Sequence, residues 1–381
     1  MPRILIMHAS VGSGHSSAAH ALADAFGRKQ AGEVRVADIL DYGSQVFREA
    51  VTQSYLQISS KAPLLWKMLY ETTDASDLVD LEPLRHRLQG RLGRPLVSKF
   101  ERFVRAYAPD VLICTHFLPV MLLSDLKVEG DWNTPLYCVI TDYMVHNQWL
   151  NRGVDGYFLA SDITRAAMIA RGVPPAILHV TGIPIKLEIA EPKPADEMRA
   201  RHRLPAGAPL IALFGGGLEP RRVRRMVTML LASAEPATLV VVAGRSSELT
   251  DALSDLSDGP RVQLRLLGKI DYVDDLVAAS DLVITKSGGL IVSEVLARGT
   301  PMLIVDPIPG QEEWNADFVA GSGAGIQLRQ PEAVPPAALF LLGQPERLAM
   351  MRGQARRFGR PRAALDIAER VLAELGSGAY R

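Results

Sequence analysis

Residues 281–315 constrain the fold of this chain more than any other segment does. The short apolar run Leu282–Thr285 leads into a Lys-Ser-Gly-Gly turn at residues 286–289, and apolar residues then recur at helical spacing. A second buried run, Met302–Val305, follows that helix. A strand, a glycine turn, a helix and another strand form the βαβ unit of a parallel sheet. We therefore predict an α/β fold with a phosphate at the glycine turn, because the free amides and the dipole of a helix amino terminus attract anions.

The same order of elements occurs near the start of the chain. Residues 4–7 form an apolar run, and Gly12, Ser13, Gly14 and His15 lead from it into helix-forming sequence. This turn lacks the third glycine of a dinucleotide-binding fingerprint. We therefore interpret it as the wall of an acceptor site and not as a cofactor site.

The remaining strand-like runs fall into two groups, separated by a proline-rich segment at residues 188–209. They lie at residues 34–39, 111–114, 136–140 and 157–160 in the first group, and at residues 210–214, 239–242 and 262–267 in the second. A chain of 381 residues, 48% of them hydrophobic, can supply two cores. We expect one Rossmann-like domain at residues 1–185, a second at residues 186–360 and a terminal helix at residues 361–381.

The composition argues against several classes of partner. Lys and Arg together number 42, as do Asp and Glu, so no net charge favours nucleic acid. Cys114 and Cys138 lie in apolar runs without metal-ligand or disulfide spacing, which fits a reducing cytoplasm. The start of the chain lacks the pattern of a signal peptide, and no apolar run reaches the ~18 residues of a membrane span. We therefore expect a cytoplasmic protein that meets lipid only at a membrane surface.

Five blocks of sequence, in the same order along the chain, resemble one known family. The blocks are Gly12-Ser13-Gly14-His15, Thr141-Asp142-Tyr143, Gly215-Gly216-Gly217, Thr285-Lys286-Ser287-Gly288-Gly289 and Pro309-Gly310-Gln311-Glu312-Glu313. They resemble the monogalactosyldiacylglycerol synthases and processive diacylglycerol glycosyltransferases, which are nucleotide-sugar glycosyltransferases of the GT-B type. The resemblance to the peptidoglycan N-acetylglucosamine transferase is weaker at the amino-terminal block. The resemblance to the GT-B glycosyltransferases implies two Rossmann-like domains whose parallel sheets face a central cleft. It also implies a terminal helix that crosses back to the first domain.

A UDP-sugar donor would lie along the carboxyl ends of the second domain's strands. Glycine turns would take the diphosphate, Glu294 the ribose hydroxyls, and Gln311 with Glu312 the sugar hydroxyls. The resemblance assigns the uracil to the backbone at Tyr272 and Val273. The full set of expected donor residues is Gly215, Gly216, Gly217, Arg245, Tyr272, Val273, Lys286, Ser287, Gly288, Gly289, Glu294, Gln311, Glu312 and Asn315. Four arginines, at 221, 222, 224 and 225, either serve an anion there or are simply solvated.

Transfer needs a base for the acceptor hydroxyl, and His15 is the first candidate. We expect its ring to be exposed in the glycine turn, with an unshifted pKa near 6.5 that leaves a good fraction neutral. Asp142 is the second candidate, either as the base or as the carboxylate that orients the imidazole. No Asp-x-Asp triplet and no zinc-ligand spacing occurs, so we expect no metal. Plant members of the family have an acid where this chain has Ser10, so an auxiliary carboxylate is missing there.

A basic, leucine-striped segment at residues 84–105 follows an aromatic one at residues 47–70. Taken alone, this pattern favours an ordinary amphipathic helix with solvated arginines. The family resemblance reverses that preference, because the acceptor it implies is a membrane lipid. The expected membrane contacts are Trp66, Arg85, Arg87, Arg91 and Arg94.

The sequence thus predicts an inverting transferase that moves a hexose from a UDP-sugar to diacylglycerol, forming a β-glycosyldiacylglycerol. It would act as a peripheral protein on the anionic inner face of the cell membrane, with the UDP-sugar as co-substrate and no other cofactor. One alternative is transfer to another lipid-linked acceptor, such as a polyprenyl diphosphate. Another is a UDP-sugar sensor without turnover. The sequence does not select among glucose, galactose and glucuronate, or decide whether the product is extended.

Overall fold

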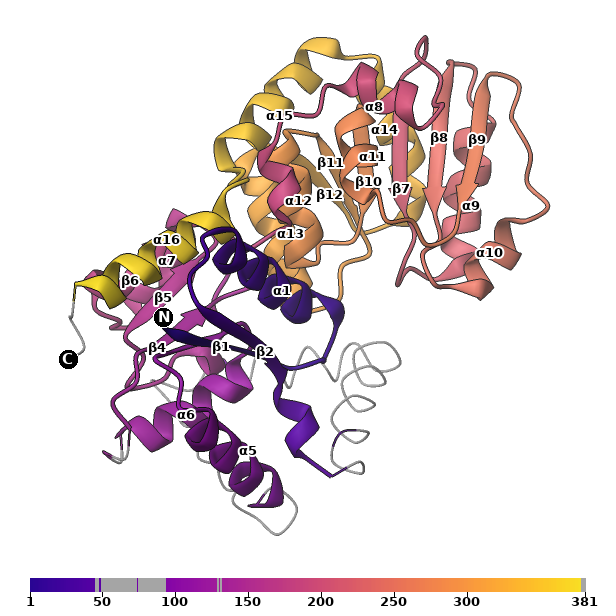
Figure 1. The fold of residues 1–381 in the computed structure, drawn as a ribbon. Coiled ribbons are helices and arrows are strands. Elements are labelled where there is room, and N and C mark those ends of the chain that lie inside the picture. The colour runs from indigo at the N-terminus through magenta and orange to yellow at the C-terminus, as the bar shows by residue number, and fades with distance from the viewer. Residues whose placement is uncertain (45–47, 49–73, 75–93, 129, 131, 378–381) are drawn as a thin grey trace. The chain divides into compact units, whose positions relative to one another are not determined.

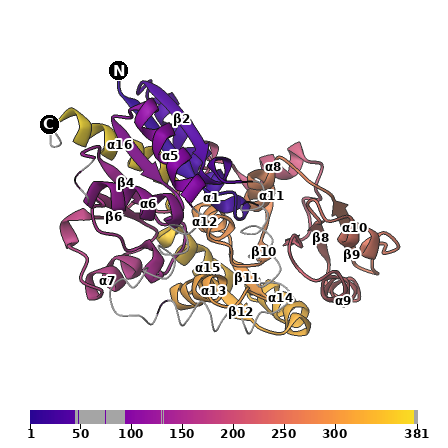
Figure 2. The ribbon, with the colours of Figure 1, turned by 90° about the horizontal axis from the view of Figure 1, so that it is seen from below.

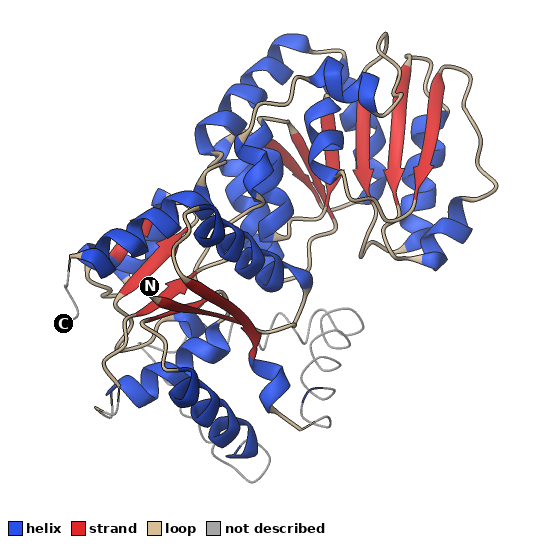
Figure 3. Cartoon of the chain, in the orientation of Figure 1, coloured by secondary structure: helices blue, strands red, loops and turns tan. Residues whose placement is uncertain are grey.

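The fold was analysed in a computed structural model that describes residues 1–44, 48, 74, 94–128, 130 and 132–377 (Figure 1). The chain forms two compact units. The first contains Met1–Glu188, Pro309–Gln311 and Arg362–Arg381, and the second contains Ile189–Ile308 and Glu312–Pro361. Each unit has one six-stranded parallel sheet with helices packed on it (Figure 3). Each unit thus has the Rossmann-like fold that the sequence predicts.

The sheet of the first unit has the strand order β2-β1-β3-β4-β5-β6, with every neighbouring pair parallel. The strands are β1 (Arg3–His8), β2 (Glu33–Asp38), β3 (Val111–Cys114), β4 (Leu136–Val139), β5 (Gly156–Leu159) and β6 (Leu178–Val180). Strand β6 was not expected from the sequence, since only Leu178 of its three residues is buried. The order of strands reverses between β1 and β3, and ligands of open α/β sheets bind at such a switch point.

Helices cover both faces of this sheet (Figure 2). They are α1 (Ser13–Arg28), α5 (Arg94–Tyr107), α6 (Phe117–Val128), α7 (Asp162–Ala170) and α16 (Ala363–Gly376), with short 3₁₀ turns at Ile39–Tyr42, Asn147–Trp149, Pro175–Ile177 and Leu187–Ala190. Successive residues of β1 point to opposite faces: Ile4 and Ile6 pack in the core with α1 and α16, whereas Leu5 and Met7 pack in the core with α5 and α6. Strands that are buried on both faces explain the continuous apolar runs in the sequence.

The terminal helix α16 packs against the first unit, beside α1. Lys29 Nζ lies 2.7 Å from Glu369 Oε1, and the Tyr137 hydroxyl donates to Glu374. Apolar residues of the helix, including Ile367 and Val371, are fully buried in the same core as β1. The last helix of the chain therefore completes the fold of the first unit.

The sheet of the second unit has the order β12-β11-β10-β7-β8-β9, again entirely parallel. Its strands are β7 (Leu210–Phe214), β8 (Ala237–Val242), β9 (Val262–Leu267), β10 (Leu282–Thr285), β11 (Met302–Val305) and β12 (Gly325–Leu328). Its helices are α8 (Ala195–Arg201), α9 (Pro220–Leu231), α10 (Ser247–Leu253), α11 (Val273–Ala279), α12 (Gly289–Arg298), α13 (Gln311–Ser322), α14 (Val334–Leu342) and α15 (Pro345–Phe358), with a 3₁₀ turn at Pro331–Ala333. The switch point lies between β7 and β10.

Strand β12 was not expected from the sequence, where Gly321 to Gly325 reads as a turn. It forms because its backbone pairs with β11, from Met302 with Gly325 to Val305 with Leu328. Among the residues that the structure describes, no helix combines the length and apolar character needed to cross a membrane.

Candidate functional site

His15 lies at the switch point of the first unit, in the first turn of α1. Gly12, with φ +89°, ends the loop after β1 and allows the chain to turn into the helix. The His15 Nδ1 atom is 2.7 Å from the carbonyl oxygen of Thr115, directly after β3, and 3.0 Å from the Thr141 hydroxyl, beyond the end of β4. In return, the Thr115 hydroxyl donates to the His15 carbonyl at 2.8 Å. The imidazole that follows β1 is thus held by residues that follow β3 and β4.

The Thr115 contact determines the tautomer of His15. A carbonyl oxygen can only accept a hydrogen bond, so the proton must be on Nδ1. The Nε2 atom then carries a lone pair and can accept a proton. Its neighbour His116 is the other tautomer, with the lone pair on Nδ1, because the amide of Leu118 donates to His116 Nδ1 at 3.1 Å.

Two expectations about His15 were wrong. The residue is partly buried and not exposed, because His116 packs edge-on against its ring with centroids 4.5 Å apart and Trp149 lies at 6.2 Å. Burial also lowers the pKa of His15 to about 4, although the Thr115 hydrogen bond acts in the opposite direction. His15 is therefore neutral throughout the physiological range, which keeps Nε2 available as an acceptor.

Asp142 is buried, at 5% exposure, one residue after Thr141. The described hydrogen bonds of the His15 ring go to Thr115 and Thr141 and not to Asp142. Gln311, which packs with the first unit, instead donates from Nε2 to Asp142 Oδ1 at 2.7 Å. The role of Asp142 as the base stays a prediction, whereas the ring of His15 is held by two neutral oxygens.

The triple glycine of the second unit connects β7 to α9. A side chain at Gly215 would lie 2.5 Å from Leu249 Cδ2, and Gly217 has φ +78°, whereas a side chain at Gly216 would meet no atom within 4 Å. The open backbone at Gly216 can therefore approach a ligand closely. In the first turn of α9 the Glu219 carboxylate accepts from the amides of Arg221 and Arg222, so these two amides are already bonded and the glycines themselves would have to meet a phosphate.

The amino terminus of α12 has no such cap. Gly288 precedes it and offers no side chain, so the first amides of the helix remain available for an anion. Lys286 lies beside them: its Nζ donates to the Gly217 carbonyl at 3.3 Å and is 3.6 Å from Glu312 Oε2. One lysine therefore connects the loops that follow β7, β10 and β11, on both sides of the switch point.

Several expected donor residues support this turn instead of facing a ligand. Ser287 is fully buried and donates from Oγ to the Glu312 carbonyl at 2.6 Å. Asn315 is also fully buried and donates to the Ser287 carbonyl at 3.0 Å. The Glu312 carboxylate accepts from the amide of Ile308 at 2.7 Å. The expectation was that Glu312 binds sugar hydroxyls and that Ser287 and Asn315 belong to the donor site; the buried Ser287 and Asn315 side chains bond within the turn.

The other expected donor residues line the same edge of the sheet. Arg245 follows β8 and is exposed, and Gly289 and the partly buried Glu294 are in α12. Tyr272 and Val273 begin α11, where the Tyr272 ring stacks on His202 with centroids 4.1 Å apart. The His202 Nε2 atom in turn lies 2.8 Å from Asp275. The Tyr272 and His202 rings, with Asp275 beside them, thus lie at the position where the resemblance expects the uracil.

The arginines of α9 mostly pair with acids. Arg222 bonds Asp306 at 3.0 Å, Arg225 bonds Glu332 at 2.9 Å, and Arg224 makes a fork with Asp255. Arg221 is exposed. The sequence left open whether these cations serve an anion, and the pairing favours a structural role for three of them.

The expected membrane contacts Trp66, Arg85, Arg87 and Arg91 lie outside the described residues. Arg94 begins α5, but its side chain also lies outside the description. In the described ranges, no group of three or more His, Cys, Asp or Glu residues could hold a metal ion.

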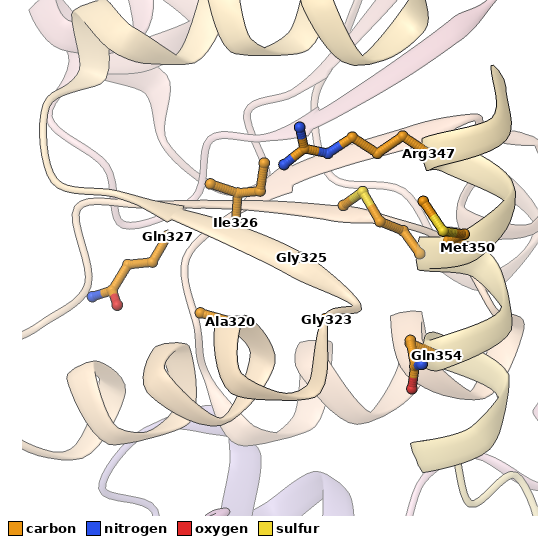
Figure 4. Close-up of a pocket in the computed structure, with 9 residues that line it drawn as sticks. Ala320, Gly323, Gly325, Ile326, Gln327, Arg347, Met350 and Gln354 are labelled. Atoms are coloured by element: carbon orange, nitrogen blue, oxygen red, sulfur yellow. The ribbon is translucent and has the colours of Figure 1, made fainter. Parts of the chain in front are cut away.

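A cavity of about 640 Å³ lies at the edge of the second unit's sheet, away from the switch point (Figure 4). Figure 4 shows Arg347 extending from α15 over the strand that carries Ile326. The lining residues are Ala320, Gly323, Gly325, Ile326, Gln327, Arg347, Met350, Met351 and Gln354. Strand β11 separates β12 from β10, so this cavity is not part of the glycine site.

The sequence gives no role to Thr115, Thr141 or Glu219, although Thr141 lies in one of the five blocks. Thr115 and Thr141 follow buried strands, and that position indicates the correct edge of the sheet. No local pattern shows that both would meet the same nitrogen of His15. Glu219 is recognisable as a helix cap only once the start of α9 at Pro220 is known.

Comparison with known proteins confirms the resemblance expected from the five blocks. The profile of the family described as "Monogalactosyldiacylglycerol (MGDG) synthase" matches residues 15–185. The processive diacylglycerol beta-glucosyltransferase of Bacillus pumilus (strain SAFR-032) is 26% identical over 351 residues, or 92% of this chain and 89% of that protein. The protein of the same name from Bacillus subtilis (strain 168) is 24% identical over 372 residues, or 98% and 95%.

Solved structures confirm the fold. MurG from Acinetobacter baumannii has a TM-score of 0.64 at 16% identity, covering 98% of this chain and 100% of that one. A UDP-GlcNAc 2-epimerase from Neisseria meningitidis, bound to UDP-GlcNAc, has a TM-score of 0.62 at 14% identity, covering 97% and 100%. Anabaena Alr3699/HepE in complex with UDP-glucose has a TM-score of 0.56 at 16% identity, covering 99% and 100%.

Proposed function

We propose that this chain transfers a hexose from a UDP-sugar to diacylglycerol with inversion at the anomeric carbon, since proteins named processive diacylglycerol beta-glucosyltransferase are similar to it over nearly its whole length. The observation that carries this proposal is the tautomer of His15. Its Nδ1 proton is bonded to the Thr115 carbonyl, so Nε2 has a free lone pair at the switch point of the first unit. Relatives that are named as diacylglycerol glucosyltransferases and neighbours solved with UDP-sugars support the acceptor and the donor, respectively.

The reaction would be a single displacement. The acceptor hydroxyl gives its proton to His15 Nε2 while its oxygen forms a bond to the anomeric carbon. The bond from that carbon to the diphosphate oxygen breaks, and UDP leaves with the electron pair. Attack from the side opposite the leaving group converts an α-linked donor into a β-linked product.

The leaving diphosphate gains negative charge, which needs stabilisation at fixed positions. The uncapped amides of α12, the open backbone at Gly216 and the Lys286 ammonium can provide it. Because Glu312 already balances Lys286 at 3.6 Å, the amides carry much of this task. We therefore expect transfer to persist in EDTA, without a divalent cation.

A parallel incubation tests the proposal. The protein is supplied with radiolabelled UDP-glucose, UDP-galactose or UDP-glucuronate, each with dioleoylglycerol or a polyprenyl diphosphate in mixed micelles. Label in the diacylglycerol product, with a large anomeric proton coupling in its NMR spectrum, supports the proposal. An α-linked product would contradict inversion, label only in the polyprenyl lipid would identify a different acceptor, and UDP-sugar binding without labelled lipid would indicate a sensor.

We also propose that the protein acts at the inner face of the cell membrane, because its acceptor would not leave the bilayer. Co-sedimentation with vesicles that contain dioleoylglycerol and phosphatidylglycerol tests this, with phosphatidylcholine vesicles as the control. Equal recovery in the supernatant with both vesicle types would contradict an anionic membrane surface as partner.

A further inference from the structure

We propose that Thr141 is a positioning residue for His15, whose hydroxyl oxygen shares the Nδ1 proton with the Thr115 carbonyl and steadies the ring as it takes up a proton. This inference rests on the proposed function, because it assigns the group that supports the base. Two neutral oxygens thus take the place of the carboxylate that the sequence offered as one possible partner of His15.

The distances define what Thr141 can do. Both the Thr115 carbonyl, at 2.7 Å, and the Thr141 hydroxyl oxygen, at 3.0 Å, lie within hydrogen-bonding distance of the same nitrogen. The carbonyl contact requires the proton to be on Nδ1, so Thr141 faces an N–H group with an oxygen lone pair. Its own hydroxyl proton must therefore point away from the ring.

This arrangement is held rigidly. Thr115 is fully buried and Thr141 is 6% exposed, each just beyond the end of a strand whose backbone is fixed in the sheet. The Thr115 hydroxyl also holds the His15 carbonyl, and His116 packs against the edge of the ring. The imidazole is thereby prevented from rotating, and Nε2 keeps one direction.

The contact becomes more important when His15 accepts a proton. Positive charge on the imidazolium spreads to both N–H groups, and hydrogen bonds from a charged donor are stronger than those from a neutral one. The described contacts give this ring no carboxylate, so the two oxygens are its means of stabilising charge away from water. Because that charge develops only as the acceptor is activated, the loss of Thr141 should lower kcat more than it raises KM.

The test compares Thr141→Val, which keeps the shape but removes the oxygen, with Thr141→Ser, which keeps the oxygen. We expect kcat to fall about tenfold in the valine variant, equivalent to about 1.4 kcal/mol, with KM for the UDP-sugar within about twofold. The serine variant should retain at least about half of the wild-type kcat. If the valine variant does not fold, Thr141→Ala, which is smaller, takes its place.

A second measurement does not depend on turnover. With ¹⁵N-histidine labelling, the His15 signals are assigned by their loss in His15→Gln. The Nδ1–H proton should resonate upfield of its wild-type position in Thr141→Val and close to it in Thr141→Ser, because one acceptor is lost only in the first. An unchanged proton shift in the valine variant would overturn the inference, as would wild-type kcat in an active enzyme. The expected shifts in a protein that transfers no sugar would instead uphold the contact and refute the proposed function.

Discussion

Gly215 and Gly216 are adjacent, but the structure predicts opposite consequences for replacing them with alanine. A Cβ atom at Gly215 would lie 2.5 Å from Leu249 Cδ2, and Leu249 is fully buried, so its side chain would have to shift within the core. Overpacking of this kind costs about 1–3 kcal/mol. A Cβ atom at Gly216 would meet nothing within 4 Å, so the free energy of unfolding should stay within about 0.5 kcal/mol of wild type.

For the affinity for UDP, in contrast to stability, Gly216→Ala should be the more damaging of the two substitutions. If the Gly216 backbone approaches the diphosphate, a methyl group there occupies the space that the phosphate needs, and the Kd for UDP should rise at least about tenfold, or about 1.4 kcal/mol. Gly215→Ala should bind UDP with a smaller loss, because its Cβ atom points into the core toward Leu249 and not toward the ligand.

Urea unfolding followed by circular dichroism measures the first effect, and isothermal titration calorimetry with UDP measures the second. Gly217→Ala serves as a further comparison, because the left-handed φ of +78° should cost about 1–2 kcal/mol without a core clash. Wild-type UDP affinity in Gly216→Ala would refute the phosphate site at this loop. Wild-type stability in Gly215→Ala would refute the close packing against Leu249.

Three further predictions concern the charged groups and histidines. His15→Gln should lower kcat about 10²- to 10⁴-fold while the Kd for UDP stays within about twofold, and titration calorimetry beside a lipid assay checks both; an equal loss of binding would argue against a role as base. Burial lowers the pKa of His15 to about 4 and also lowers the pKa values of His8 and His116, so the unfolded chain binds protons that the folded chain does not. The free energy of unfolding should therefore fall between pH 7 and pH 5. An unchanged free energy of unfolding in urea across that range would contradict this prediction. Lys286→Met should weaken UDP binding about tenfold, because it removes a cation beside α12. Glu312→Gln should strengthen UDP binding, because it removes the carboxylate that balances Lys286. Equal UDP affinities of both variants and the wild type in calorimetry would show that the pair does not face the diphosphate.

The sequence predicted correctly that the glycine turns follow the strands of two parallel sheets, because that placement follows from local patterns. An apolar run, a glycine turn and a helical repeat define one βα unit, and the right-handed connection of such units leaves every turn at the carboxyl end of a parallel sheet. The patterns at His15 and at Gly288 were therefore sufficient to predict two Rossmann-like folds. The edge strands β6 and β12 were missed because so short a run carries little pattern of its own, and the backbone of a neighbouring strand decides whether it pairs.

The sequence by itself thus determined the fold class, the three glycine turns and the choice of His15 as candidate base. Only the tertiary structure decided the state of that base, because Thr115 and Thr141 are 100 and 126 residues from His15 and meet it only when β1, β3 and β4 become neighbours. The same holds for the donor turn, where Glu219 occupies the amides of α9 and leaves α12 available. Periodicity is a property of adjacent residues, whereas protonation and hydrogen bonding depend on which distant groups the packing brings together and on how far it removes them from water.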